Sequence, residues 1–163
     1  MPMVIILIGV AGSGKTTVGR LLATRLGCEF HDGDDLHPTR NREKMSRGIA
    51  LTDEDRSPWL HAIRELVERC LAENRSAVIA CSTLKQKYRD LLVVDEAKVK
   101  IVYLKGSQAL ITQRLVRRAG HFFDPHLLKS QFETLEEPAD AIVVDIAETP
   151  EKIADTIRAR LGS

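Results

Sequence analysis

Aromatic side chains are scarce in this sequence, and neither sign of charge dominates it. Phe, Trp and Tyr make up 4% of the 163 residues, and 24 Lys and Arg stand against 23 Asp and Glu, a net charge of +1. Broad binding to nucleic acid or to a membrane surface needs a basic excess, and single-strand binders add aromatic residues between the basic ones. The composition therefore excludes a general nucleic-acid or membrane-surface binder.

Cysteines and long apolar runs are also few. Cys28, Cys70 and Cys81 are odd in number and widely spaced, without a C-x-x-C pair or a His/Cys cluster, so the spacing indicates neither a metal site nor a disulfide framework. The apolar run near the N-terminus is far shorter than the roughly 20 residues of a membrane span, and no signal-peptide pattern surrounds it. We therefore expect three reduced, mostly buried thiols in a cytoplasmic protein.

A glycine-rich motif follows that first apolar run. Residues 9–16 read Gly-Val-Ala-Gly-Ser-Gly-Lys-Thr, a complete G-x-x-x-x-G-K-[ST] pattern, and a helical pattern that ends at Gly27 comes next. Glycines let backbone N–H groups surround a polyphosphate, the lysine reaches the β- and γ-phosphates, and the final hydroxyl binds Mg²⁺. The motif predicts a nucleoside triphosphate site with Mg²⁺ at Thr16. The residues assigned to the nucleotide are Gly9, Gly12, Ser13, Gly14, Lys15, Thr16 and Thr17.

Apolar β-type runs alternate with helical patterns along the chain. The runs cover residues 3–8, about 28–31, 76–81, 99–104 and 141–145. This alternation is typical of βαβ units and a parallel sheet covered on both faces. No repeat, low-complexity segment or linker divides the chain. We therefore expect one α/β domain over residues 1–163, with a five-stranded parallel sheet flanked by helices.

Several helix starts carry a capping residue. At Ser57–Pro58, Asp124–Pro125 and Thr149–Pro150 a small polar residue precedes proline, which fits the first helical position because no N–H is needed there. An apolar stripe that includes Trp59 follows the first of these pairs. Ser107 is expected to cap a helix that runs to about Arg118.

Two aspartates, Asp32 and Asp34, follow the second expected strand. Because ligands of parallel sheets bind at the carboxyl ends of the strands, both should face the phosphate-binding motif. A phosphoryl acceptor needs a carboxylate to orient its hydroxyl and take the proton, and a second carboxylate can hold Mg²⁺. We assign Asp34 to the acceptor and Asp32 to Mg²⁺; a solvated Asp-Gly-Asp turn is the alternative.

Two motifs of other nucleotide-binding proteins are missing. The third expected strand ends Ala80-Cys-Ser-Thr83 without the Mg²⁺-binding aspartate that motor-like ATPases and switch GTPases place there. The chain also lacks an Asn-Lys-x-Asp run for guanine selection. Both absences favour a kinase that acts on a small metabolite.

Arg114, Arg117 and Arg118 lie at i, i+3 and i+4 of one expected helix. Alone, such a row indicates a solvated helix face, but Gly120-His-Phe-Phe123 follows it, and a hinge glycine with aromatic residues is typical of a closing lid. A lid over approximately residues 114–126 would exclude water and place a guanidinium on the transferring phosphoryl group. The spacing leaves the individual roles open; we assign Arg118 to catalysis and Arg114 and Arg117 to the nucleotide.

Basic and hydrogen-bonding side chains gather between the second strand and the helix after the third. They suit an anionic acceptor rich in hydroxyl groups, with basic groups for a carboxylate and Asn and His for the alcohols. Each of them alone would be interpreted as a surface residue. The predicted acceptor site consists of Asp34, His37, Asn41, Lys44, Arg56, Lys85 and Arg89, with His121 from the lid.

Motifs in order over residues 4–146 resemble those of the gluconokinases. Besides residues 9–16 they are Asp32-Gly-Asp-Asp-Leu-His-Pro38, Asn41-x-x-Lys44-Met45, Leu51-Thr-Asp-Glu-Asp-Arg-x-Pro-Trp-Leu60, Cys81-Ser-Thr-Leu-Lys85, Tyr88-Arg-Asp-Leu91, Gly120-His-Phe-Phe123 and Gln131-Phe-Glu-Thr-Leu135. The His-Pro and Gly-His-Phe-Phe segments are not general features of P-loop kinases, so the resemblance is specific.

The resemblance implies an enzyme that uses ATP and Mg²⁺ to phosphorylate the 6-hydroxyl of D-gluconate. It further implies the fold of adenylate and shikimate kinases with a mobile lid, Asp34 at the acceptor hydroxyl, adenine near the loop after Asp145, and a homodimer. A P-loop kinase for another sugar acid, shikimate or a nucleoside monophosphate is the alternative, and an ATP-binding regulatory module is a third interpretation.

Overall fold

A five-stranded parallel sheet forms the centre of the molecule. The computed structural model describes residues 2–117 and 125–162, and the strands are β1 (Val4–Ile8), β2 (Glu29–Asp32), β3 (Ala77–Ala80), β4 (Val99–Lys105) and β5 (Ile142–Asp145). They are ordered β2-β3-β1-β4-β5, and every neighbouring pair is parallel. The predicted fold class is confirmed, and each predicted strand boundary lies within one residue of the observed one.

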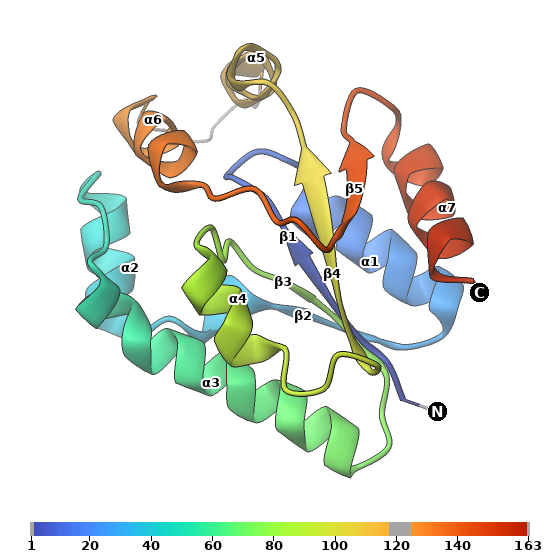
Figure 1. Cartoon of the computed structure of the whole chain (residues 1–163). Coiled ribbons are helices and arrows are strands. Elements are labelled where there is room, and N and C mark those ends of the chain that lie inside the picture. Colours follow the sequence, from blue (N-terminus) through green and yellow to red (C-terminus); the bar gives the residue numbers. More distant parts are fainter. Residues whose placement is uncertain (1, 118–124, 163) are drawn as a thin grey trace.

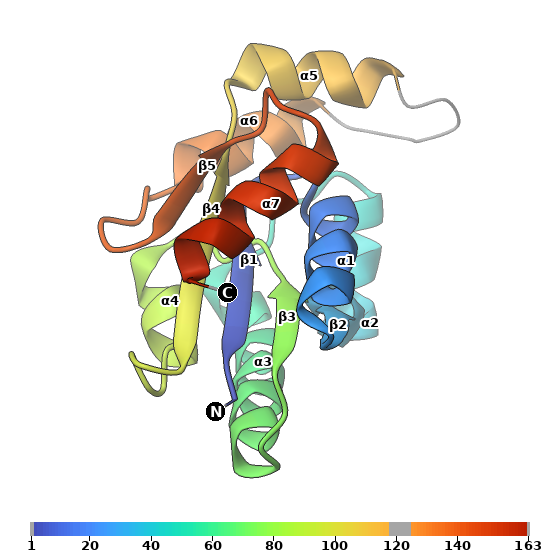
Figure 2. The same cartoon turned by 90° about the vertical axis from the view of Figure 1, so that its right-hand side faces the viewer.

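Helices cover both faces of the sheet (Figures 1 and 2). The helices α1 (Lys15–Leu26) and α7 (Pro150–Leu161) pack on one face, and α3 (Asp53–Ala72) and α4 (Gln86–Leu92) pack on the other. All five side chains of β1 are buried: Ile5 and Leu7 face the first pair of helices, whereas Val4, Ile6 and Ile8 face the second. A strand that is apolar on both faces belongs in the middle of a covered sheet, as β1 does.

The remaining helical segments lie around the carboxyl ends of the strands (Figure 1). They are the 3₁₀ turn η1 (Gly33–Leu36), α2 (Thr39–Ser46), α5 (Gln108–Arg117) and α6 (Pro125–Thr134). Two predicted caps are confirmed: Ser107 Oγ accepts from the N–H of Leu110 at 3.1 Å, and Thr149 Oγ1 accepts from the N–H of Lys152 at 3.2 Å. The capping role predicted for Asp124 lies outside the described residues.

The predicted helix start at Ser57–Pro58 is wrong. The helix α3 begins at Asp53 because Thr52 caps it: Thr52 Oγ1 accepts from the N–H of Asp55 at 3.1 Å, and the Asp55 carboxylate accepts from the N–H of Thr52 at 3.0 Å. This reciprocal arrangement satisfies two N–H groups at once. Pro58 therefore lies in the second turn, where one hydrogen bond to a preceding carbonyl is lost without breaking the helix.

The three cysteines are free thiols, as expected: Cys70 and Cys81 are buried and Cys28 is half-buried. Among the described residues, the structure has no helix long and apolar enough to cross a membrane.

Candidate active site

The phosphate-binding loop joins β1 to α1. Gly14 stands before the first turn of α1 with a φ of +93°, a conformation that L side chains rarely adopt, and no side chain caps this helix end. A Cβ at Gly9 would lie 2.5 Å from Ser13 Oγ, a buried hydroxyl without a hydrogen-bond partner among the described residues. The Lys15 ammonium donates to the carbonyls of Gly9 at 2.9 Å and Val10 at 3.0 Å. The loop thus combines uncapped backbone N–H groups with a cation, which suits a polyphosphate.

Thr16 and Asp32 meet at the start of α1 and the end of β2. Thr16 Oγ1 donates to Asp32 Oδ2 at 3.3 Å, and Asp32 Oδ1 accepts from the N–H of Asp34 at 3.0 Å. A hydroxyl and a carboxylate at this separation are hard oxygen ligands of the kind that Mg²⁺ prefers. The two residues predicted to bind Mg²⁺ are therefore brought together, and their chemistry fits the ion.

A cavity of about 240 Å³ opens beside the loop. Four of the residues predicted from the sequence line it: Lys15, Asp34, His37 and Arg56. The other lining residues were not among the predicted site residues; they are Ala11, Met45, Ile49, Ala50, Leu51, Trp59, Ser82, Leu84, Ser130 and Gln131. Charged groups for a phosphoryl acceptor therefore share this cavity with an apolar wall.

Asp34 lines the cavity and is exposed to solvent. The surrounding protein nevertheless displaces enough water to raise the pKa of its carboxyl, and Lys15 opposes this shift. A carboxylate with a raised pKa accepts a proton more readily than an ordinary aspartate does. The position and the pKa of Asp34 both suit the role of a base.

Gln131 and Trp59 are the main contributions that sequence reasoning missed. Gln131 Oε1 accepts from the N–H of Ala11 at 2.6 Å, so α6 contacts the phosphate-binding loop directly. Trp59 Nε1 donates to the carbonyl of Gly33 at 2.8 Å, and its ring stacks on His37 with centroids 4.3 Å apart. In the sequence, Gln131 belongs to one of the motifs that resemble the gluconokinases, and Trp59 belongs to the apolar stripe of α3. Neither pattern indicates that the residue lines a cavity.

His37 is buried between this indole ring and Asn41. Asn41 Nδ2 lies 3.2 Å from His37 Nδ1 and donates to the carbonyl of Asp55 at 2.7 Å. Burial first, and then the cations Arg42 and Arg56, lower the pKa of His37 to about 4. His37 is therefore neutral at pH 7. Asn41 is fully buried and orients His37 rather than lining the cavity.

We expect the burial of His37 to reduce stability as the pH falls from 6.5 to about 4. Above pH 6.5 both folded and unfolded chains hold the ring neutral; below it only the unfolded chain gains the proton, until the folded pKa is reached. Denaturant unfolding at pH 7 and pH 5 should show that wild type loses about 2 kcal/mol more than His37→Gln.

The control for this experiment is His61→Gln on the exposed side of α3, which should retain the wild-type loss. Asp55, whose pKa is lowered to about 2 chiefly by its hydrogen bond from Lys44, loses its stabilisation below the tested window. Equal losses in wild type and His37→Gln would show that His37 is not the responsible group.

Two of the basic residues predicted for the acceptor pair with carboxylates of α3 instead of lining the cavity. Lys44 Nζ lies 2.8 Å from Asp55 Oδ2, and Lys85 Nζ lies 3.3 Å from Asp53 Oδ1. Asp53 also accepts from Lys87 and from the Tyr88 hydroxyl, and these contacts hold the pKa of Asp53 below its usual range. This network holds the start of α3 against α4.

Arg89 lies away from the cavity and is only 1% exposed. Its guanidinium donates to the carbonyl of Thr83 at 2.8 Å, to Gln86 Oε1 at 3.1 Å and to the carbonyl of Glu136 at 2.5 Å. These contacts join α4 to the segment after α6, and the contact of Arg89 with the acceptor stays a prediction.

Arg89→Met should lower the free energy of unfolding by about 3 kcal/mol, because two buried carbonyls lose their donor. Denaturant unfolding measures the change, and Arg40→Met, at an exposed arginine of α2, should stay within about 0.5 kcal/mol of wild type. An unchanged unfolding free energy with a raised KM for the acceptor would instead support the role predicted from the sequence.

The predicted lid is only partly described. The Arg114 guanidinium donates to the carbonyl of Ile146, in the loop after β5, and Arg117 is exposed at the end of α5. Arg118 and His121, assigned to catalysis and to the acceptor, lie outside the described residues. Arg114 thus contacts the loop at which the resemblance places adenine.

The phosphate-binding loop between β1 and α1, together with Asp32 at the end of β2 and Asp34 just after it, defines a P-loop kinase. Residues 11–161 match the shikimate kinase family, whose members share this fold. The thermosensitive gluconokinase of Escherichia coli (strain K12) is 47% identical over 145 residues, which cover 86% of this chain and 78% of that protein. The chain belongs to the gluconokinase family.

Two solved structures agree with this assignment. A gluconokinase from Sinorhizobium meliloti 1021 is 42% identical with a TM-score of 0.86, covering 98% of this chain and 93% of that one. A sugar kinase from Janibacter sp. HTCC2649 is 38% identical with a TM-score of 0.92, covering 99% and 95%. The resemblance inferred from the motifs is confirmed.

Proposed function

We propose that this enzyme transfers the γ-phosphoryl group of ATP to the 6-hydroxyl of D-gluconate, giving ADP and 6-phospho-D-gluconate. The observation that carries the proposal is the cavity in which Lys15 and Asp34 lie together beside the phosphate-binding loop. The acceptor is inferred from the relatives, two of which are gluconokinases at 47% and 42% identity.

Residues of the loop would hold ATP, and Thr16 with Asp32 would hold Mg²⁺. The uncapped N-terminus of α1 and the buried Ser13 hydroxyl leave donors for phosphate oxygens. When bound, Mg²⁺ neutralises charge that develops on the phosphate oxygens. The contact between Thr16 and Asp32 is the observation that supports this assignment.

Asp34 would orient the 6-hydroxyl of gluconate and accept its proton. As the hydroxyl oxygen forms its bond to phosphorus, the bond from phosphorus to the bridging oxygen of ADP breaks, and Lys15 balances the negative charge. Arg56, which lines the cavity and donates to the Tyr88 hydroxyl at 3.1 Å, would bind the carboxylate of gluconate. Neutral His37 would hydrogen-bond an alcohol group.

The remaining assignments are part of the same proposal. Asn41, Lys44 and Lys85 would act through the residues that they contact, as Asn41 does through His37. A single domain over residues 1–163, a lid over about 114–126 with Arg114, Arg117, Arg118 and His121, a homodimer and a cytoplasmic location are inferred from the sequence.

The test is ADP production with Mg-ATP and a panel of acceptors: gluconate, other aldonates, shikimate, AMP and CMP. Turnover with gluconate at least 100-fold above the other acceptors supports the proposal. Turnover with another acceptor and none with gluconate would support kinase activity but rule out gluconate as the substrate. Tight ATP binding without turnover on any acceptor would favour a regulatory module.

A further inference from the structure

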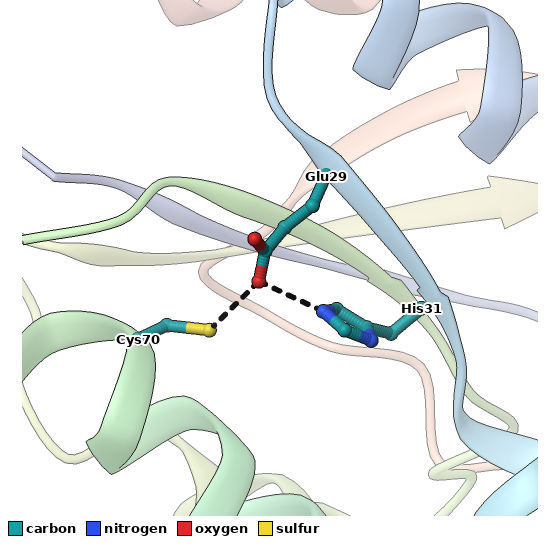
Figure 3. A group of neighbouring side chains, drawn as sticks. All are labelled: Glu29, His31 and Cys70. Carbon is teal, nitrogen blue, oxygen red and sulfur yellow. Dashed lines mark hydrogen bonds and ion pairs between the residues drawn. The ribbon is translucent and has the colours of Figure 1, made fainter. Parts of the chain in front are cut away.

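Glu29, His31 and Cys70 bring three different metal-binding atoms together at the start of β2. Figure 3 shows the two β2 side chains directed toward Cys70, which lies on α3. Their ligand atoms all lie within 4.8 Å of one another; Glu29 Oε1 is 2.9 Å from His31 Nε2 and 3.6 Å from Cys70 Sγ. Three potential ligands therefore converge on one point.

The fold creates this cluster, and the spacing of the cysteines does not indicate it. Glu29 and His31 are two positions apart on a strand, so they face the same side of the sheet. Cys70 lies near the end of α3, on the stripe that packs against that side. The cluster is separate from the candidate Mg²⁺ site, because Glu29 begins β2 whereas Asp32 ends it.

The donor atoms suit a borderline-soft divalent cation such as Zn²⁺. A thiolate, an imidazole and a carboxylate are common zinc ligands, and in a tetrahedral zinc site neighbouring ligand atoms are about 3.5 Å apart. The Glu29–His31 separation of 2.9 Å and the Glu29–Cys70 separation of 3.6 Å are close to this value, and the His31 and Cys70 ligand atoms lie within 4.8 Å of each other. The side chains of His31 and Glu29 are 35% and 32% exposed, so a cation can reach them from solvent.

Arg75 opposes cation binding. Its Nη1 lies 2.5 Å from Glu29 Oε1, the same oxygen that faces His31 and Cys70. The other guanidinium nitrogen, Nη2, lies 2.8 Å from Glu73 Oε2, and the arginine side chain is 38% exposed. Arg75 can therefore release Glu29 and keep Glu73 as its partner.

We propose that Glu29, His31 and Cys70 bind one Zn²⁺-type cation, with a water molecule as the fourth ligand. Binding displaces Arg75 from Glu29 and releases the thiol proton of Cys70 to solvent. The cation joins β2 to α3, and Arg75 sets its affinity by competing for the carboxylate.

The test uses Co²⁺ as a spectroscopic substitute for Zn²⁺ on the full chain. Wild type should bind one equivalent with a thiolate-to-cobalt charge-transfer band, which oxygen ligands such as those of the Mg²⁺ site do not produce. Cys70→Ser should lose the band and Cys28→Ser should keep it. Because Cys70 is buried, His31→Ala serves as a second variant; it should weaken Zn²⁺ binding, measured by competition with Co²⁺, at least tenfold.

Arg75→Gln provides the sharpest test of the arrangement. It removes the competing guanidinium and should tighten Zn²⁺ binding several-fold. If the ion pair between Arg75 and Glu29 had only a structural role, its loss would not tighten Zn²⁺ binding. Zn²⁺ at a concentration that saturates wild type should also raise the Tm of wild type, and it should raise that of His31→Ala by less. The absence of the band in wild type, its survival in Cys70→Ser, or unchanged affinity in Arg75→Gln would each overturn the proposal.

Discussion

Lys15→Ala is expected to lower kcat/KM for ATP by about 10³-fold. Lys15 is the cation of the phosphate-binding loop, and it lines the same cavity as Asp34. Its ammonium is held against the carbonyls of Gly9 and Val10, so its position is set before a nucleotide arrives. Steady-state kinetics with ATP as the varied substrate, at saturating gluconate, measures the loss.

The control is Lys152→Ala, which removes an exposed lysine from α7 and should leave both kinetic constants unchanged. The Tm of Lys15→Ala without ligands should remain close to that of wild type, because the contacts of Lys15 with the loop are partly exposed. Unchanged steady-state kinetics in Lys15→Ala would contradict the prediction that residues 9–16 bind the nucleotide.

Asp34→Asn is expected to lower kcat by about 10²- to 10⁴-fold, with the KM for ATP within about threefold of wild type. The amide keeps the shape of the side chain but cannot take the proton of the acceptor hydroxyl. In wild type, activity should fall as the pH drops through the raised pKa of Asp34, because only the carboxylate acts as a base. The measurement is kcat with gluconate at saturating Mg-ATP.

Asp35→Asn is the matched control, since Asp35 is exposed in the same 3₁₀ turn. It does not line the cavity, and kcat should remain near the wild-type value. Near-wild-type turnover in Asp34→Asn would assign the role of the base to Asp32 or remove it from the mechanism.

The strands and the phosphate-binding loop were predictable because their signals are local. An apolar run such as residues 3–8 is stable only as a buried strand of a covered sheet. The glycine pattern of residues 9–16 determines the backbone conformation of the phosphate-binding loop. The start of α3 was mispredicted because two local signals compete. The reciprocal cap of Thr52 and Asp55 outweighs the proline cap at Ser57.

The candidate site was predictable only in part, because the partner of a charged side chain depends on tertiary packing. Arg56 and Arg89 have the same chemistry in the sequence, yet Arg56 lines the cavity and Arg89 binds buried carbonyls. Lys44 finds its partner 11 residues along the chain. Glu29 and Cys70 meet across 41 residues, a separation that no spacing rule covers.

Trp59 is the single tryptophan of the sequence, and it lies in the wall of the cavity beside the phosphate-binding loop. Selective excitation of tryptophan therefore gives fluorescence from one indole ring, which stacks on the ring of His37. Trp59 is therefore an intrinsic fluorescent probe of this cavity. We expect an acceptor that binds in this cavity to change the tryptophan fluorescence, so that binding can be measured without a label and without turnover.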